Sequence, residues 1–438
     1  MAAPNVIRDL QQRARDGLKV GRFDDALAAA RNLLAFSPGD PDALAVAGIA
    51  SLLLGQAEPA IAHLEAAVKR RQDMPVVWLH LGNARKTLGR KDDAIKAYRK
   101  ALTLKPDLAP ASHNLGTLLQ EAGQHEEAAA IYRAAIARAP QPAGTWRNLA
   151  LALEETKHLK EAEEAYRQAI AKDPDWLIPR SAHMRLLWTL REMDALLAAC
   201  DDWLAKRPGD TEALAWTCLA LAEKGEAARL AALLDFDGLV RVFDHDPPPG
   251  WASMAEFHAA LRAHVYAHPT LKVPPQDHPT YHHPDLAITE ELLAGTRGPM
   301  EGYEALVRLA VERYRASLPA DHPVRVHWPA RWRLSVWATL LKGQGNLVPH
   351  IHLDGYIGGV YYALLPAVAA REDSDQAAWF ELGRPPEELG CTHIPSTRRI
   401  QPREGRMILF PSYFYHGTVP FTAGEDRISI AFDVVPEP

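Results

Sequence analysis

A repeat of 34 residues governs the first half of the chain. The segment 75–108 has conspicuous residues at repeat positions 4, 7, 8, 20, 24, 27 and 32, namely Trp78, Leu81, Gly82, Ala94, Tyr98, Ala101 and Pro106. Adding 34 gives Leu115, Gly116, Ala128, Tyr132, Ala135 and Pro140, and adding it again gives Trp146, Leu149, Ala150, Ala162, Tyr166, Ala169 and Pro174. Such a period predicts stacked copies of one small unit, each burying its apolar face against its neighbours.

The residue types at these positions predict a pair of helices in each repeat. Small residues at positions 8, 20 and 27 let two antiparallel helices approach closely, aromatic residues at 4 and 24 fill the space between pairs, and the proline at 32 ends the second helix. The pattern weakens outward, in the segments 7–40, 41–74 and 177–210, and a partial repeat runs from Thr211 to about Leu234. The signature resembles the tetratricopeptide repeat. We therefore expect an all-α solenoid of about six to seven repeats over residues 1–235.

A tetratricopeptide array implies either a groove that binds a partner or a rigid spacer or dimerisation surface. In the register above, Asn114 and Asn148 occupy position 6 of the first helix, and His80 occupies it one repeat earlier. Equivalent positions stack along a solenoid, and an amide can both donate to and accept from a peptide backbone. The row resembles the asparagine ladder in the repeats of O-GlcNAc transferase. We predict that these residues bind a peptide or protein partner, the alternative being chance placement on helix surfaces.

Composition narrows the range of partners and compartments. A chain of 438 residues exceeds what one core usually serves, which predicts at least two domains. The net charge is -6, and no basic run appears, so nucleic acid is not the expected partner. The three cysteines show no CxxC spacing, the first residues lack the apolar block of a signal peptide, and no stretch of 18 apolar residues occurs. We expect a cytoplasmic protein without a membrane span.

The second half is expected to be a separate β-rich domain, over residues 236–438. Its start is marked by three prolines and a glycine within Phe243–Trp251. Predicted helices cover Met254–Tyr266 and Gly302–Leu318, and predicted strands cover Gly238–Phe243, Arg333–Leu341, Gly359–Leu365, Ala378–Leu382, Arg406–Phe410 and Arg427–Val434. Short strands with no helix between most of them favour an antiparallel sandwich or jelly-roll barrel. Arg427, Ser429 and Ala431 alternate onto one face of the last strand, which implies a polar face turned toward a ligand cavity.

The residues with metal-ligand chemistry lie beside these strands. His352 and Asp354 are two residues apart, which places them on the same side of an extended chain, and His416 follows a later strand. Two imidazoles and a carboxylate form the facial triad of non-haem iron(II) oxygenases, which leaves positions open for other ligands. His350 is a competing ligand, because His350-x-His352 also begins a cupin motif. A cupin needs a glutamate a few residues later, and residues 356–359 contain none.

Arg427 is the candidate for binding an anionic cosubstrate. It follows His416 by eleven residues, its guanidinium can bind a carboxylate in bidentate fashion, and Ser429 on the same face can donate a further hydrogen bond. One of the adjacent tyrosines Tyr361 and Tyr362 is expected to face the cavity, and we assign Tyr361 to it. The remaining histidines of interest, in the loop Asp277–Pro284, are interpreted as exposed polar residues; they are His278, His282 and His283.

The order of HxD, a distal histidine and RxS resembles the iron(II)/2-oxoglutarate oxygenase superfamily. The sequence around these residues is similar to an oxygenase family often found C-terminal to tetratricopeptide repeats in bacteria. The similar segments are His350-x-His352, Gly358–Tyr362, Phe410–Ser412, His416 and Arg427–Phe432. The resemblance implies that iron(II) is held by His352, Asp354 and His416 and that Arg427 binds 2-oxoglutarate.

The implied activity is that of a dioxygenase that uses iron(II), 2-oxoglutarate and O2. With a repeat array attached, the expected reaction is hydroxylation of a peptide or protein side chain. Two alternatives stay open. One is a scaffold whose barrel is catalytically inactive or only senses a metal, and the other is an oxygenase that acts on a small molecule while the repeats mediate self-assembly.

Overall fold

The computed structural model describes residues 4–275, 285–295, 297–372 and 375–437. Packing divides the chain into two compact units, Met1–Leu186 and Leu187–Pro438. The loop that contains His278, His282 and His283 lies outside the described residues. Among the helices that the structure describes, none combines the length and apolar character that crossing a membrane requires.

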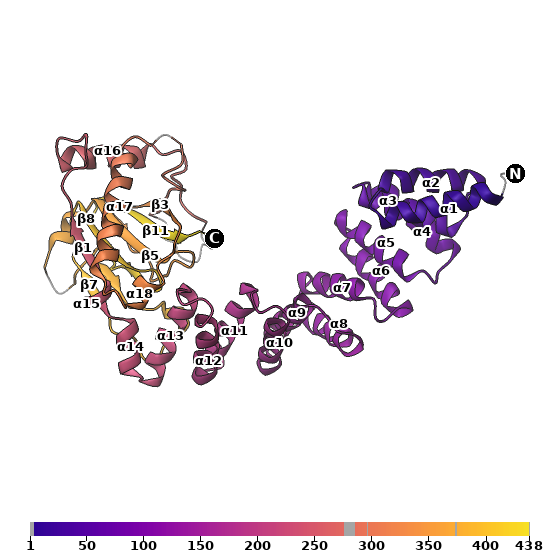
Figure 1. Cartoon of the computed structure of the whole chain (residues 1–438), viewed down its shortest axis with the longest axis horizontal. Coiled ribbons are helices and arrows are strands. Elements are labelled where there is room, and N and C mark those ends of the chain that lie inside the picture. The colour runs from indigo at the N-terminus through magenta and orange to yellow at the C-terminus, as the bar shows by residue number, and fades with distance from the viewer. Residues whose placement is uncertain (1–3, 276–284, 296, 373–374, 438) are drawn as a thin grey trace. The chain divides into compact units, whose positions relative to one another are not determined.

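The first unit is a stack of helix pairs (Figure 1). Its helices are α1 (Pro4–Lys19), α2 (Phe23–Phe36), α3 (Pro41–Leu53), α4 (Ala57–Arg70), α5 (Pro75–Thr87), α6 (Lys91–Leu104), α7 (Ala109–Glu121), α8 (His125–Arg138), α9 (Ala143–Glu155) and α10 (Leu159–Lys172), and α11 (Leu177–Thr189) spans the division. The first helices of successive pairs start 34 residues apart, at Pro75, Ala109 and Ala143. The predicted repeat solenoid is confirmed.

The signature residues of the repeat contact each other inside each pair. A Cβ atom added at Gly82 would collide with the ring of Tyr98, and one added at Gly116 would collide with the ring of Tyr132. Both tyrosines are fully buried. The glycine at position 8 therefore makes room for the aromatic ring at position 24, which explains why the two recur together.

The second unit begins with the last helices of the array and continues into the barrel. These helices are α12 (Met193–Leu204), α13 (Thr211–Lys224) and α14 (Ala227–Leu233). The end of α11 and the start of α13 bond to the barrel loops: Trp188 Nε1 donates to Leu389 O at 2.8 Å, and Thr211 Oγ1 donates to Gly355 O at 2.7 Å. The change from repeat helices to strands comes near residue 240, but the packing unit starts about fifty residues earlier.

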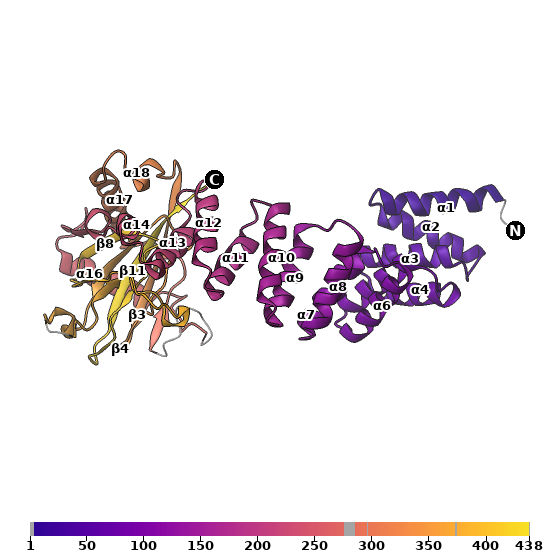
Figure 2. The same cartoon turned by 90° about the horizontal axis from the view of Figure 1, so that it is seen from below.

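The barrel is built from antiparallel sheets, as expected for a jelly-roll domain. The large sheet has the order β1 (Arg241–Asp244), β8 (Arg406–Pro411), β5 (Ile357–Leu364), β11 (Arg427–Pro436), β3 (Trp332–Leu341) and β2 (Leu286–Ile288). Smaller sheets are formed by β7 (Arg398–Ile400), β6 (Phe380–Leu382) and β9 (His416–Thr418), and by β10 (Phe421–Thr422) and β4 (Gln344–Gly345). The additional helices are α15 (Phe236–Leu239), α16 (Met254–Tyr266), α17 (Met300–Ser317) and α18 (Pro323–Val326). Figure 2 shows the same elements from below.

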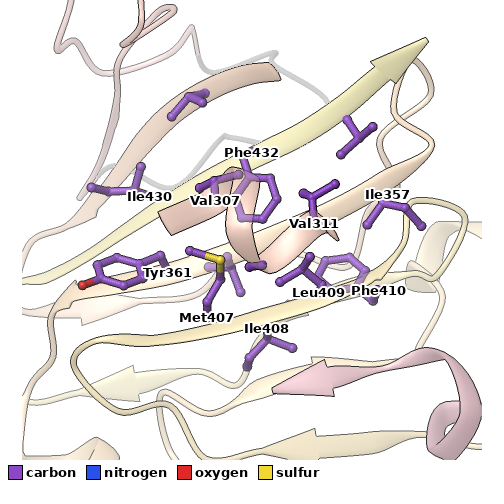
Figure 3. Packing of buried hydrophobic residues seen from close by; sticks show 14 of the residues in the cluster. Val307, Val311, Ile357, Tyr361, Met407, Ile408, Leu409, Phe410, Ile430 and Phe432 are labelled. Atoms are coloured by element: carbon purple, nitrogen blue, oxygen red, sulfur yellow. The ribbon is translucent and has the colours of Figure 1, made fainter. Parts of the chain in front are cut away.

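The two faces of the large sheet have different roles. On one face Met407, Ile430 and Phe432 pack with Val307 and Val311 of α17 in a fully buried core (Figure 3). Because side chains alternate along a strand, their neighbours in sequence point to the opposite face. That face lines a cavity whose far side is formed by residues of β6 and β9.

We expect Gly116→Val to destabilise the first unit, because its side chain must enter the space that the Tyr132 ring occupies. Overpacking of this kind costs about 1–3 kcal/mol. Gly144→Ala is the matched control, since a Cβ there meets nothing within 4 Å and Gly144 lies in α9. Alanine in a helix is favoured over glycine by about 0.5–1 kcal/mol. Thermal unfolding followed by circular dichroism should show opposite shifts for the two variants, and equal midpoints would contradict the packing described.

Candidate metal centre

Three histidine side chains converge at one end of the cavity. The ligand atoms of His350, His352 and His416 all lie within 4.8 Å of one another, and Nε2 of His350 is 3.3 Å from Nε2 of His352. Imidazole nitrogens bound to one metal ion at about 2.0–2.1 Å lie roughly 2.8–3.4 Å apart, depending on the bond angle. The His350–His352 pair has this spacing, and the third imidazole lies near enough for the group to hold a metal ion. It is the one group of potential metal ligands found among the residues that the structure describes.

Each ring is oriented by a hydrogen bond at its other nitrogen. Nδ1 of His350 donates to Val348 O at 2.8 Å, and Nδ1 of His416 donates to Phe414 O at 3.0 Å. Nδ1 of His352 donates to Asp433 Oδ1 at 2.7 Å. An acceptor at Nδ1 fixes the proton there and leaves the Nε2 lone pair for a metal. All three imidazoles thus present the same nitrogen to one point.

The electrostatics of the cluster favour the neutral form of His350 and His416. Burial, together with the neighbouring His352, lowers the pKa of His350 to about 3. Burial and the two neighbouring rings also lower the pKa of His416 well below its usual value. Only the neutral form of histidine binds a metal, so these residues need lose no proton near neutral pH. The residues present fit a divalent transition metal.

The structure does not bring Asp354 to this cluster. Asp354 lies in an exposed turn, and Gly355 N closes that turn by donating to His352 O at 3.1 Å. The alternation that put Asp354 beside His352 holds only in extended chain, and the chain turns immediately after His352. His350 occupies the position in the cluster that was expected for Asp354. It precedes the turn and pairs with His416 in an isolated antiparallel bridge.

A buried arginine lines the same cavity. Arg427 is 1% exposed, and its Nη1 donates to Ser429 Oγ at 3.1 Å, while Ser429 Oγ lies 2.6 Å from Thr339 Oγ1. Its guanidinium lies over the Tyr362 ring at 5.3 Å, and its Nε is buried without a hydrogen-bond partner. Burial lowers the pKa of Arg427, but a guanidinium keeps its proton in proteins.

Within the described part of the chain, no carboxylate pairs with Arg427, although the ion pairs of that part include many other arginines. A buried and unpaired cation is costly. An anionic ligand in the cavity would offset this charge, and Ser429 lies beside the arginine on the same face, as the sequence predicted.

Tyr361 does not face the cavity. It packs on the helix side of the sheet, with its ring 5.5 Å from that of Tyr303 and its hydroxyl 2.7 Å from Nε2 of His258. Tyr362 lies on the face of Arg427 instead, and it pairs with Ser429 in the β5–β11 register. The prediction chose the wrong one of two adjacent tyrosines. Which of the two faces the cavity is decided by how β5 pairs with its neighbour strands, and the sequence alone does not show this pairing.

In the predicted row of partner-binding residues, the two asparagines make hydrogen bonds to other residues of the repeats. Nδ2 of Asn114 donates to Asn83 Oδ1 at 2.8 Å, and the same oxygen accepts from Tyr98 Oη. Asn148 is buried, and its Nδ2 lies 3.4 Å from Tyr132 Oη. His80 is half-buried with a lowered pKa, owing to burial. Binding a peptide through these amides would require their present hydrogen bonds to exchange, and the role of the row stays a prediction.

A second cleft adjoins the histidine cavity. Its volume is about 400 Å³, and it shares Leu347, Gly417 and Thr418 with that cavity. On its wall, Arg384 and Arg399 both bond to the buried Glu381. Burial opposes the charge of this carboxyl, but the bonds from the two arginines outweigh it and lower its pKa. The cleft and the histidine cavity lie side by side, with the shared residues Leu347, Gly417 and Thr418 between them.

Family comparisons agree with this geometry. Residues 335–433 match the family described as "Putative 2OG-Fe(II) oxygenase", and residues 18–81, 75–108 and 113–175 match tetratricopeptide-repeat families. The chain is a tetratricopeptide-repeat protein with a C-terminal domain of this oxygenase family. The match to the oxygenase family begins in β3 and ends in β11, so it contains the three histidines and Arg427. No curated protein matches the chain at a significant level.

Solved structures are similar to part of this chain. MamA is 23% identical over 39% of this chain and 94% of its own, with a TM-score of 0.36. TTC0263, a tetratricopeptide-repeat protein of Thermus thermophilus, is 23% identical over 41% of this chain and 98% of its own, with a TM-score of 0.32. PilF of Pseudomonas aeruginosa is 16% identical over 48% of this chain and 95% of its own, with a TM-score of 0.40.

We predict that His350→Ala abolishes stoichiometric metal binding by the oxygenase domain and that Asp354→Ala leaves it unchanged. The reason is that His350 lies within the cluster, whereas Asp354 points to solvent from a turn. Titration with Co(II) in a calorimeter, with the unfolding midpoint of each metal-free variant as the control for folding, measures the difference. A loss in Asp354→Ala equal to that in His350→Ala would restore the carboxylate to the ligand set.

Proposed function

We propose that the protein is an iron(II)- and 2-oxoglutarate-dependent dioxygenase whose metal ligands are His350, His352 and His416. The observation that carries the proposal is that a three-imidazole cluster and a buried arginine without a carboxylate partner, among the described residues, line one cavity. A 2-oxoglutarate molecule has a keto acid that suits the metal side and a far carboxylate that suits Arg427. Arg427 and Ser429 would hold that carboxylate by charge-assisted hydrogen bonds.

The residues of the cavity would orient the reactants and limit access of water. Trp337 packs edge-on against His352 with ring centroids 5.1 Å apart, and Phe410 lies 4.6 Å from the His416 ring. These rings hold the imidazoles and leave few polar groups besides the ligands and Arg427. Iron(II) with 2-oxoglutarate and O2 supplies the oxidising power for C–H hydroxylation, and the protein supplies orientation and exclusion of side reactions.

The substrate that we favour is a peptide or protein side chain recruited by the repeats. The cleft beside the histidine cavity leaves room for such a side chain, because it is about 400 Å³ in volume and shares Gly417 and Thr418 with that cavity. A small molecule would fit the same cleft and stays the alternative substrate class. The other alternative is an inactive or sensory barrel, for which three histidines around zinc would suffice.

Conversion of 2-oxoglutarate to succinate tests the proposal. Protein stripped of metal is supplied anaerobically with Fe(II), Zn(II) or no metal, and air and 2-oxoglutarate are then added. Succinate formed only with Fe(II), and absent in His352→Ala, is the expected result. Tight binding of Zn(II) without any succinate in the Fe(II) sample would favour the sensory barrel. Mass spectrometry of captured proteins, for a shift of about 16 Da that depends on His352, would separate protein from small-molecule substrates.

We predict that Arg427→Met weakens 2-oxoglutarate binding about tenfold to hundredfold and leaves metal affinity intact. A hydrogen bond to a charged group contributes about 1.5–3 kcal/mol, and each 1.4 kcal/mol is tenfold in affinity. Arg406→Met is the control, because Arg406 is paired with Asp244 on strand β1 and not with the cavity. Apparent affinity from the 2-oxoglutarate dependence of succinate formation measures both. An unchanged value for Arg427→Met would move the carboxylate site elsewhere.

We also predict that changing Asn114 and Asn148 together to alanine weakens capture of a protein substrate and leaves substrate-free conversion of 2-oxoglutarate unchanged. Because Asn114 bonds to Asn83, a small loss of stability is expected as well, about 0.5–1.5 kcal/mol per hydrogen bond. Thr117→Ala controls for this loss, since its hydroxyl also bonds within the repeat. Undiminished capture by the double variant would remove the row from the partner site.

A further inference from the structure

We infer that Asp433 is a positioning residue of the metal centre and supplies the negative charge that a three-histidine ligand set lacks. The inference rests on the proposed function, because it concerns the proposed metal. Asp433 Oδ1 accepts a hydrogen bond from His352 Nδ1 at 2.7 Å, on the side of the ring away from the cluster. The carboxylate is therefore one imidazole away from the point where the three Nε2 atoms converge.

The structure is built to hold this carboxylate. Asp433 is 6% exposed and lies on β11, where it shares a face with Arg427 and Ser429. A Cβ atom at Gly355 would lie 2.9 Å from Asp433 Oδ1, and one at Gly358 would lie 3.4 Å from it. Glycine at both positions leaves the space that the carboxylate and the His352 ring occupy.

The ion-pair partners of Asp433 point to a cation beyond the imidazole. Within the described residues, its ion pairs extend only to His352, whereas the buried Glu381 has both Arg384 and Arg399. A buried carboxylate with neither lysine nor arginine beside it is costly, because its charge has little to offset the loss of water. A divalent ion on the Nε2 side of His352 would provide the missing positive charge.

The charge of the whole centre supports the same assignment. A divalent ion held by two imidazoles and one carboxylate has a net charge of +1, and one held by three neutral imidazoles has +2. Asp433 restores +1 through the His352 ring. A carboxylate bonded to the second nitrogen of a ligating histidine fixes the ring and strengthens its Nε2 as a donor. His352 thus combines the geometry of a neutral ligand with part of the charge of an anionic one.

The test compares metal affinity in full-length variants. Asp433→Asn keeps the size of the side chain and an oxygen that can accept from Nδ1, but it removes the charge. We expect a loss of Co(II) affinity of about tenfold to hundredfold, the range typical of such partners. The dissociation constant is measured by calorimetry with Co(II) alone, and the visible absorption of bound Co(II) is a second readout. Asp244→Asn is the matched control, since it removes a carboxylate from the same domain at the β1 edge.

The outcomes separate the inference from the proposed function. If Asp433→Asn binds Co(II) like the wild type while His352→Ala does not, Asp433 has no such role and the metal centre stands. If Asp433→Asn binds like the wild type and only Asp433→Ala is weakened, the hydrogen bond acts without the charge, which overturns the assignment. If His352→Ala also binds normally, the metal centre itself is wrong. A lower unfolding midpoint of metal-free Asp433→Asn with unchanged affinity would assign Asp433 to folding alone.

Discussion

The alternation of side chains along β11 is the constraint on which the C-terminal half depends. β11 lies between β3 and β5, and it is paired with β3 over its whole length. Ile428, Ile430 and Phe432 point into the core against the helices. The alternate residues Arg427, Ser429 and Asp433 lie on the opposite face, which is the face of the cavity, and they provide the arginine, the serine and the carboxylate of the site. A slip of one residue in this register would exchange the two sets, so the same pairing that buries the core also places the chemistry.

The histidine cluster depends on contact between sheets. His416 opens β9 of a small sheet, and His350 lies in the loop that leads to β5 of the large one. The two are joined by an isolated bridge, in which the backbone N–H of each donates to the carbonyl of the other at 3.0 Å. Backbone pairing therefore sets the distance between His350 and His416, and the bond to Asp433 orients the ring of His352. Each ring of the proposed metal site is therefore held in place by a hydrogen bond at its Nδ1 atom.

The sequence correctly predicted the elements that have a regular pattern, namely the repeat helices and the long strands. It did not predict the positions of side chains where the chain turns. The 34-residue period located the helix pairs, and the long strands β3, β5, β8 and β11 were predicted within two residues. Strands of two or three residues, such as β4 and β9, contain too little alternation to be seen. Asp354 was assigned as a ligand because the alternation of an extended strand was assumed to continue through a turn. Tyr361 was assigned to the cavity without knowledge of the strand pairing that decides which face each tyrosine occupies. Asp433 was overlooked although it continues the alternation of Arg427 and Ser429.

The last repeat helices support the loops around the site. The barrel therefore depends on the repeat helices to which it is joined. Thr211, at the start of α13, holds the carbonyl of Gly355 in the turn that follows His352, and Glu223 at its end accepts from the backbone of Thr392. Trp188 holds the carbonyl of Leu389, close to the residues that line the adjoining cleft. The loops on both sides of the cluster therefore end on helices of the array. A jelly-roll barrel alone would leave these loops without their partners, so the folded unit that carries the site is the barrel together with the end of α11 and helices α12 to α14.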